Sequence, residues 1–145
     1  MVREIRENEL TDLLELYLHL HETSVPEITE EVLSTWNTIL KDKNHHIIVN
    51  EIDGRIVASC VCVIIPNLAR NIRPYALIEN VVTHEQYRGK GHATLCLEYA
   101  KGIAEKMHCY KMMLLTGSKE EKTLKFYENA GYNRLDKTGF VQWLE

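Results

Sequence analysis

The hydrophobic positions of the chain follow two different spacings. A spacing of three to four residues predicts helices over residues 10–18, 30–40, 92–107 and 119–130. Alternating or continuous apolar runs predict strands over residues 2–6, 46–52, 55–65, 75–83, 110–116 and 140–144. The strand over residues 55–65 is apolar on both faces, so we expect it in the middle of a sheet that is covered on both sides.

Polar residues and glycines separate these segments. The expected N-caps of the first, second and fourth helices are Asn8, Thr29 and Ser118. Ser118 is followed three residues later by Glu121, which is the spacing of a capping box. Asp53-Gly54 is the dipeptide that a type I′ turn prefers, so it predicts a hairpin. Gly131 suits the left-handed residue that ends a helix.

The order of the elements is typical of one mixed domain. Antiparallel strands come first and a β-α-β unit follows, so we expect an α/β fold of the α+β mixed-sheet kind, with helices on both faces. The length of 145 residues is that of a single domain, and we assign residues 1–145 to it.

Composition and charge narrow the class of partner. Apolar residues make up 45% and charged residues 26% of the chain, which excludes low-complexity and strongly disordered classes. No window approaches the roughly 20 apolar residues of a membrane helix, and the first residues lack the apolar core of a signal peptide. The net charge of −4 does not fit a general nucleic-acid binder. We therefore expect a cytoplasmic protein that binds a small molecule or a local patch on another protein, and neither nucleic acid nor membrane.

The four cysteines and seven histidines form no metal motif. Cys60 and Cys62 are two residues apart in an apolar run, whereas a metal knuckle needs Cys-x-x-Cys pairs with turn residues between them. The adjacent His45 and His46 point to opposite faces of a strand. We therefore expect buried cysteines and no metal site.

The stretch from Glu79 to Thr94 carries the clearest candidate chemistry. A strand runs into the turn Arg88-Gly89-Lys90-Gly91, and that turn opens a helix. Helix N-termini present unpaired N–H groups, glycines let an anion approach, and the two cations add charge, so the pattern predicts a phosphate or pyrophosphate site. A Walker loop would need Ser or Thr after Gly-Lys, and a dinucleotide fingerprint would need a third glycine. A tight turn whose glycines serve only backbone geometry is the alternative.

Two motifs resemble the GNAT superfamily of N-acetyltransferases. Arg88–Ala93 is similar to the family's Arg/Gln-x-x-Gly-x-Gly/Ala turn, which binds the pyrophosphate of acetyl-CoA. Phe126–Tyr132 reads Phe-Tyr-Glu-Asn-Ala-Gly-Tyr and resembles the family's Phe-Tyr-Glu-x-x-Gly-Phe segment. The element order resembles the GNAT fold over essentially the whole chain. The resemblance implies an enzyme that moves the acetyl group of acetyl-CoA to a primary amine of a small molecule by direct attack in a ternary complex.

The resemblance also implies where acetyl-CoA binds. It places the cofactor between two parallel strands that splay apart, residues 75–83 and 110–116. The end of the first strand would bind the pantetheine arm, and the turn would bind the pyrophosphate. The cofactor-binding residues implied in this way are Val81, Val82, Thr83, Arg88, Gly89, Lys90, Gly91, His92, Ala93 and Thr94. The N–H of Val82 is the expected donor to the oxyanion.

Two side chains are expected to move protons. The resemblance makes Tyr127 the acid that protonates the departing thiolate, whereas spacing alone would place this tyrosine in the core. The resemblance also makes Glu79 the expected base, since relatives often place an acid before the cofactor-binding end of this strand; Glu79 is moreover a single charge in an otherwise apolar strand. A partly exposed, hydrogen-bonded carboxylate is the alternative for Glu79, and His84 is a second candidate base. This chain has Glu120 where many relatives carry an Asn that contacts the cofactor.

The acceptor amine is left open by the sequence. Arg70 and Arg73, in the loop over residues 66–74, are candidate partners for a phosphate or carboxylate of the substrate. Three short segments, residues 79–82, 109–111 and 125–128, also resemble glucosamine-phosphate N-acetyltransferases. A protein or peptide amine as acceptor, and an acyl-CoA-binding module without turnover, are the alternatives. Residues 140–144 are a candidate edge strand, either within the chain or in a homodimer.

Overall fold

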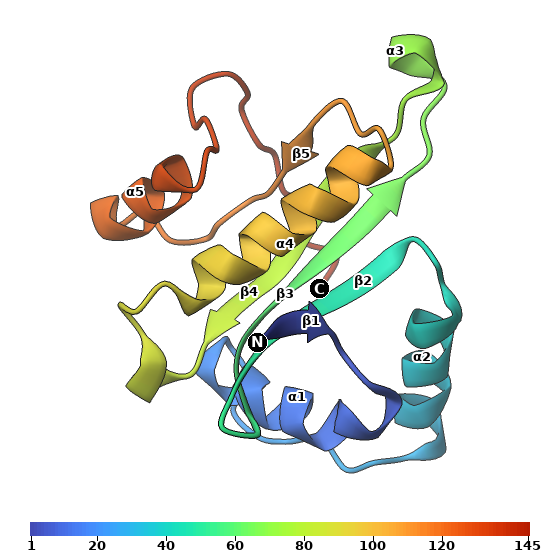
Figure 1. Cartoon of the computed structure of the whole chain (residues 1–145), viewed down its shortest axis with the longest axis vertical. Coiled ribbons are helices and arrows are strands. Elements are labelled where there is room, and N and C mark those ends of the chain that lie inside the picture. The colour runs from blue at the N-terminus through green and yellow to red at the C-terminus, as the bar shows by residue number, and fades with distance from the viewer.

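A five-stranded sheet with the strand order β1-β2-β3-β4-β5 forms the middle of the molecule (Figure 1). The computed structural model describes all 145 residues. The strands are β1 (Val2–Glu4), β2 (His45–Ile52), β3 (Arg55–Ile65), β4 (Tyr75–Thr83) and β5 (Met112–Met113). β1 to β4 pair antiparallel and β5 pairs parallel with β4. The predicted mixed sheet with one parallel pair is therefore confirmed.

Helices cover both faces of this sheet, as predicted. α1 (Leu10–Leu16) and α2 (Glu30–Lys41) contribute to one core, while α4 (His92–Lys106) and α5 (Glu121–Asn129) pack against the other. Figure 1 shows α4 lying across β3 and β4. α3 (Ala69–Ile72) is a single turn between β3 and β4, and three short 3-10 helices occupy Glu7–Glu9, Tyr17–His19 and Glu85–Tyr87. No helix has the length and apolar character needed to cross a membrane.

Each face of the sheet has its own hydrophobic core. The core under α4 contains 11 buried residues and the core under α1 and α2 contains eight. β3 supplies both, because Cys60 and Cys62 point to the α4 side while Val61 between them points to the α1 side. The prediction of a central strand apolar on both faces is therefore confirmed. All four cysteines are free.

Local turn chemistry behaves largely as the sequence predicts. Asp53 and Gly54 have φ angles of 49° and 79°, as a type I′ turn requires at both central positions. The Thr29 hydroxyl caps α2 by accepting a hydrogen bond from the Val32 N–H at 3.3 Å. Gly131 has φ of 100° and follows the last turn of α5, where a left-handed residue ends a helix.

Two of the predicted N-caps are wrong. Asn8 lies inside the first 3-10 helix instead of capping α1. Ser118 lies two residues before the cap of α5, and its hydroxyl accepts from the Glu120 N–H at 3.3 Å. Glu121 does not complete a capping box, because its carboxylate pairs with Arg134 at 2.7 Å. The Glu121 carboxylate is thus directed toward Arg134, 13 residues later in the sequence.

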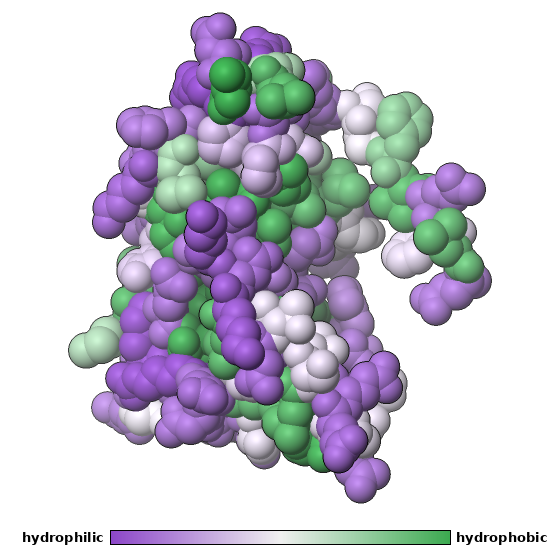
Figure 2. All heavy atoms as spheres, turned by 90° about the vertical axis from the view of Figure 1, so that its right-hand side faces the viewer, coloured by the Kyte–Doolittle hydropathy of each residue, from purple (hydrophilic) through white to green (hydrophobic).

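Three predicted strands are shorter than expected or absent. β1 ends at Glu4 and β5 contracts to two residues, because only two positions of β5 lie opposite β4. Residues 140–144 form no strand, because no neighbouring strand of the chain pairs with them. They are exposed, and Figure 2 shows a terminal arm of mixed hydrophobic and hydrophilic residues standing clear of the body.

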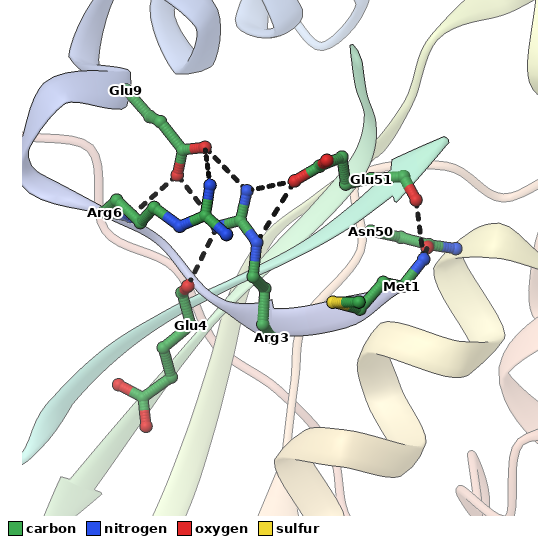
Figure 3. A network of polar contacts seen from close by, with 7 residues as sticks. All are labelled: Met1, Arg3, Glu4, Arg6, Glu9, Asn50 and Glu51. Atoms are coloured by element: carbon green, nitrogen blue, oxygen red, sulfur yellow. Dashed lines mark hydrogen bonds and ion pairs between the residues drawn. The ribbon is translucent and has the colours of Figure 1, made fainter. Parts of the chain in front are cut away.

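A network of charged and polar groups joins β1, β2 and the start of α1 (Figure 3). The Arg3 guanidinium donates to both Glu9 carboxylate oxygens, at 2.9 and 2.6 Å, and its Nε donates to Glu51 at 3.2 Å. Only 14% of the Arg3 side chain and 12% of the Glu9 side chain are exposed. These bonds to Arg3 lower the pKa of Glu9. The Met1 ammonium donates to Asn50 Oδ1 at 3.2 Å, which extends the network along β2.

Candidate active site

The turn between β4 and α4 presents a row of backbone N–H groups without backbone partners. α4 begins at His92, and its first hydrogen bond runs from the Leu95 N–H to the Gly91 carbonyl at 3.1 Å. The six N–H groups from Gly89 to Thr94 donate to no other backbone group. Unpaired donors at a helix N-terminus carry partial positive charge and favour an anion. The backbone geometry of this turn therefore suits the anion-binding role that the sequence predicts.

Two glycines shape this turn. Gly89 and Gly91 have φ angles of 75° and 80°, in the left-handed region that favours glycine. A Cβ atom at either position would have no neighbour within 4 Å. The glycines are therefore required by the backbone conformation and not by crowding, and they leave open space beside the free N–H groups.

The two cations of the turn have different partners. Arg88 donates to the Thr83 carbonyl at 3.2 Å and to the His19 carbonyl at 3.1 Å, so it ties the turn to the connector that follows α1. The Lys90 ammonium lies 5.6 Å from the centre of the Tyr87 ring. Both side chains are exposed. The Lys90 ammonium makes one long hydrogen bond, to the Gln86 carbonyl at 3.5 Å, so Lys90 is held less firmly than Arg88, which donates to two carbonyls at shorter distances.

β4 and β5 pair over only two positions. Ala76 lies opposite Met112 and Leu77 lies opposite Met113. From Ile78 to Thr83 the β5-facing edge of β4 has no partner strand. The predicted parallel pair that splays apart is confirmed, and the unpaired edge of β4 leads directly into the glycine turn.

A bulge lies just beyond the point where β4 loses its β5 partner. Asn80 has φ of 50°, and the register between β3 and β4 shifts between Ser59 and Val61. A bulge of this kind bends the strand and increases its twist. The bend gives a local cause for the separation of β4 from β5.

The hydrogen bonds of β4 decide which backbone groups face the open edge. The His84 N–H donates to the Val57 carbonyl of β3 at 2.8 Å. Because successive N–H groups of a strand alternate in direction, the Val82 N–H points toward β3 as well. The N–H groups of Val81 and Thr83 then point toward the unpaired edge. Val81 and Thr83, and not Val82, are therefore available to a ligand in the gap.

Glu79 and Tyr127 lie on opposite sides of β4. Glu79 is paired with Val61, whose side chain belongs to the core under α1 and α2, so the Glu79 side chain emerges on that side. It is exposed and forms no hydrogen bond or ion pair. Tyr127 packs against the core under α4. A group in the gap would have the carboxylate on one side and the phenol on the other.

Tyr127 is half-buried in a small aromatic cluster. Its ring centre is 4.9 Å from that of Phe126 and 6.2 Å from that of Tyr132. Burial raises the pKa of Tyr127, and the negative charge of the Glu79 carboxylate raises it further. The phenol is therefore protonated at neutral pH and can donate a proton.

The hydrophobic pattern assigned Tyr17 to a core, and the structure agrees. It follows α1 and packs against the core under α1 and α2, on the same side of β4 as Glu79. Burial raises the pKa of Tyr17, and the nearby Asn80 side chain opposes this shift.

Asn50 is a residue that the sequence did not single out. Its Nδ2 lies 3.0 Å from Nδ1 of His92, and its side chain is almost fully buried at 1% exposure. Asn50 thereby fixes the ring of the first residue of α4 from β2. No motif could reveal this pair, because the two residues are 42 positions apart.

The loop over residues 66–74 lies at the opposite end of β4 from the glycine turn. β4 has nine residues, so its ends are roughly 25–30 Å apart at about 3.3 Å per residue. Arg73 donates to two backbone carbonyls of the segment before β5, at 3.0 and 3.1 Å. Arg70 makes no hydrogen bond, and its guanidinium carbon lies 5.4 Å from the centre of the Tyr110 ring. Of the two arginines, Arg73 is held in place by these two bonds, whereas all five guanidinium donors of Arg70 are free.

His84 has protein partners on both ring nitrogens. Its Nδ1 accepts from the Gln86 N–H at 3.2 Å and its Nε2 is 2.9 Å from Arg55. Burial lowers the pKa of His84, as do the neighbouring His19 and Arg55. These contacts favour Glu79 over His84 as the group that is free to accept a proton. No cluster of three or more His, Cys, Asp or Glu side chains is placed to hold a metal ion.

Comparison with known proteins agrees with this geometry. The model of the acetyltransferase (GNAT) family matches residues 10–132. The glucosamine 6-phosphate N-acetyltransferase of Trypanosoma brucei brucei is 30% identical over 133 residues, which cover 90% of this chain and 87% of that protein. A solved protein of Agrobacterium tumefaciens str. C58 is 37% identical with a TM-score of 0.92, over 99% of both chains. The glucosamine-6-phosphate N-acetyltransferase of Arabidopsis thaliana shares the fold, with a TM-score of 0.86 and 23% identity, over 100% of this chain and 98% of that one.

Proposed function

The chain belongs to the GNAT family of acetyltransferases, and we propose that it transfers the acetyl group of acetyl-CoA to the primary amine of a small molecule by direct attack in a ternary complex. One observation carries this proposal: six unpaired N–H groups, Gly89 to Thr94, adjoin the unpaired edge of β4. Acetyl-CoA combines a pyrophosphate with an arm that contains amides. The turn complements the first feature and the strand edge complements the second.

Each part of the binding surface has a proposed role. The N–H groups from Gly89 to Thr94, with the Lys90 ammonium, hold the pyrophosphate, and the Thr94 hydroxyl adds a donor. The outward backbone groups of Val81 and Thr83 pair with the pantetheine arm. We also assign the oxyanion donor to the Val81 N–H, because the Val82 N–H points toward β3. The side chain of Val82 is buried in the core under α1 and α2, where it helps to hold β4 in place.

The proposed chemistry uses the two sides of β4. Acetyl-CoA supplies the thioester: the acceptor nitrogen bonds to its carbonyl carbon, the carbon–sulfur bond breaks, and the nitrogen loses a proton. Glu79 accepts that proton, directly or through water, and Tyr127 gives its phenolic proton to the thiolate sulfur and regains one from solvent. Because Glu79 and Tyr127 lie on opposite sides of β4, the amine approaches on one side and the thiol departs on the other.

We propose a phosphorylated amino sugar as the acceptor class. The support is the similarity over most of both chains to the trypanosomal protein whose name specifies glucosamine 6-phosphate. Arg70 is the candidate partner of the phosphate group, because its guanidinium has free donors whereas Arg73 is held by backbone carbonyls. An Arg70→Ala variant is expected to have a higher KM for glucosamine 6-phosphate and an unchanged KM for glucosamine.

One experiment tests the proposed function. The protein is incubated with acetyl-CoA and an amine panel of glucosamine 6-phosphate, glucosamine, amino acids, polyamines and peptides, while free thiol is followed. Thiol release that depends on glucosamine 6-phosphate is expected. Turnover with peptides alone would indicate a protein acceptor, and stabilisation by acetyl-CoA without any turnover would indicate a binding module. No rise in melting temperature with acetyl-CoA or CoA would overturn the cofactor assignment.

A further inference from the structure

Asn50 and Ser59 are the two polar residues buried in the sheet, at 1% and 0% exposure. The Ser59 hydroxyl bonds within the sheet, because it donates to the Ile48 carbonyl at 2.8 Å. Asn50 points to the same face as Ile48, which belongs to the core under α4. Its Nδ2 lies 3.0 Å from Nδ1 of His92. A buried amide needs a partner of this kind, and here the partner is the first residue of α4.

The contacts of the Asn50 amide decide which nitrogen of the His92 ring carries a proton. The Met1 nitrogen lies 3.2 Å from Asn50 Oδ1 and 2.6 Å from the Glu51 carbonyl oxygen (Figure 3). The Met1 nitrogen can only donate, so the amide oxygen of Asn50 faces Met1 and the amide NH2 group faces His92. The NH2 group also only donates, so Nδ1 of His92 accepts and carries no proton. Neutral His92 therefore has its proton on Nε2.

The ring of His92 connects the two ends of the glycine turn. Its centre lies 5.9 Å from that of Tyr87, in an edge arrangement. Tyr87 ends the 3-10 helix that precedes the turn, and His92 begins the helix that follows it. The ring that closes the turn is thus held by Asn50 from β2. Because the His92 N–H is one of the six free donors from Gly89 to Thr94, the position of this residue bears on where those donors point.

We propose that Asn50 and neutral, Nε2-protonated His92 are a positioning pair that holds the glycine turn in the geometry that binds CoA. The proposal rests on the proposed function, since it concerns the same pyrophosphate site. Neither side chain has to touch the cofactor for this role. Donors that are already in place bind an anion without a cost of ordering. A turn without the pair would have to be ordered during binding, so its CoA affinity would be lower.

Nuclear magnetic resonance of ¹⁵N-labelled histidine tests the tautomer without any cofactor. The signals of His92 are assigned by their loss in a His92→Leu variant. At neutral pH we expect the chemical shift of an unprotonated nitrogen at Nδ1 and that of a protonated nitrogen at Nε2. A proton on Nδ1 would overturn the proposal, because the Asn50 amide could not then donate to it.

An Asn50→Leu/His92→Leu double variant tests the effect on the turn. It removes both partners together and leaves no buried group unpaired, while Met1 keeps its bond to the Glu51 carbonyl, so a melting temperature close to the natural one is expected. The dissociation constant for CoA, measured by calorimetry, should rise roughly tenfold. The KM for acetyl-CoA should rise with it, whereas the KM for the amine should not.

Ser59→Ala is the matched control, because it removes the other buried side-chain hydrogen bond of the sheet. It should lower the melting temperature and keep the natural CoA affinity. Equal losses of CoA affinity in the control and the double variant would overturn the proposal, since general loosening of the sheet would explain both. Natural CoA affinity in the double variant would overturn it while leaving the proposed function intact. A natural chain that does not bind CoA would overturn the proposed function and the pair's role together.

An Asn50→Asp variant gives a second readout that does not depend on the double variant. A carboxylate at position 50 can only accept, so the proton of His92 should move to Nδ1 and the ring should stay joined to β2. This variant should therefore keep most of the CoA affinity. A proton that stays on Nε2 alone, or a tenfold loss of CoA affinity despite the shifted proton, would overturn the proposal.

Discussion

Replacing Gly91 with alanine separates the backbone role of the turn from its binding role. Gly91 has φ of 80°, and a Cβ atom there would meet nothing within 4 Å. The only cost in the free protein is the left-handed conformation, which is about 1–2 kcal/mol for a residue with a side chain. The free energy of unfolding should fall by that amount, which lowers the melting temperature by roughly 3–8 °C for a domain of this size.

The same substitution should weaken CoA binding much more than it weakens the fold. The added methyl group occupies the open space through which we expect the pyrophosphate to reach the free N–H groups. Loss of one or two charge-assisted hydrogen bonds costs about 1.5–3 kcal/mol. The dissociation constant for CoA, measured by calorimetry, should therefore rise roughly 10- to 100-fold.

Gly54 provides a matched control for this prediction. It has φ of 79° in the β2–β3 hairpin, and a Cβ atom there also has no neighbour within 4 Å. Gly54→Ala should lower the melting temperature as much as Gly91→Ala and leave CoA affinity unchanged. Equal CoA affinity in the two variants would refute the assignment of the turn to the pyrophosphate.

Three further variants test the remaining assignments. Tyr127→Phe should lower kcat at least tenfold with little change in CoA affinity. Tyr132→Phe, in the same aromatic cluster, should leave kcat unchanged. Equal losses of kcat in the two variants would rule out Tyr127 as the acid. Glu79→Gln should lower kcat/KM for the amine with little change in CoA affinity, and a kcat/KM equal to that of the natural enzyme would exclude Glu79 as the base. Arg3→Met should lower the free energy of unfolding by about 2 kcal/mol at neutral pH. Arg3 lowers the pKa of Glu9, so this stabilisation is fully present above the unfolded pKa of Glu, about 4.3. It is lost as the pH falls through the lower pKa of the folded protein. Urea titrations at several pH values should therefore show that the free energies of unfolding of the two proteins become equal in acid.

Elements governed by local chemistry could be predicted from the sequence. β3 and β4 have the predicted bounds, because each is a long apolar run bordered by residues that end a strand. The hairpin turn follows from the tolerance of Asp53 and Gly54 for positive φ. The glycine turn was equally predictable, because both the free N–H groups and the left-handed glycines are consequences of a helix that starts there.

Elements governed by distant partners could not be predicted. β5 is short because the bulge at Asn80 bends its neighbour away, and no pattern within residues 110–116 records that bend. Tyr99 and Met107 fit the apolar stripe of α4, but both are more than a third exposed, since the helix buries a narrower face. Likewise, Asn50 reaches His92 only because β2 passes the start of α4.

The positions of two connecting segments in the fold also bear on which of them we expect to select the acceptor. The sequence predicts two such segments, the loop over residues 66–74 and the segment between the first two helices, and the loop lies at the opposite end of β4 from the glycine turn. The connector after α1 instead lies on the Glu79 side, where Tyr17 is beside Asn80 and the His19 carbonyl accepts from Arg88. We therefore expect the connector to contact an acceptor amine that reaches Glu79, and we expect the loop, with Arg70, to contact only the part of the acceptor farthest from that amine.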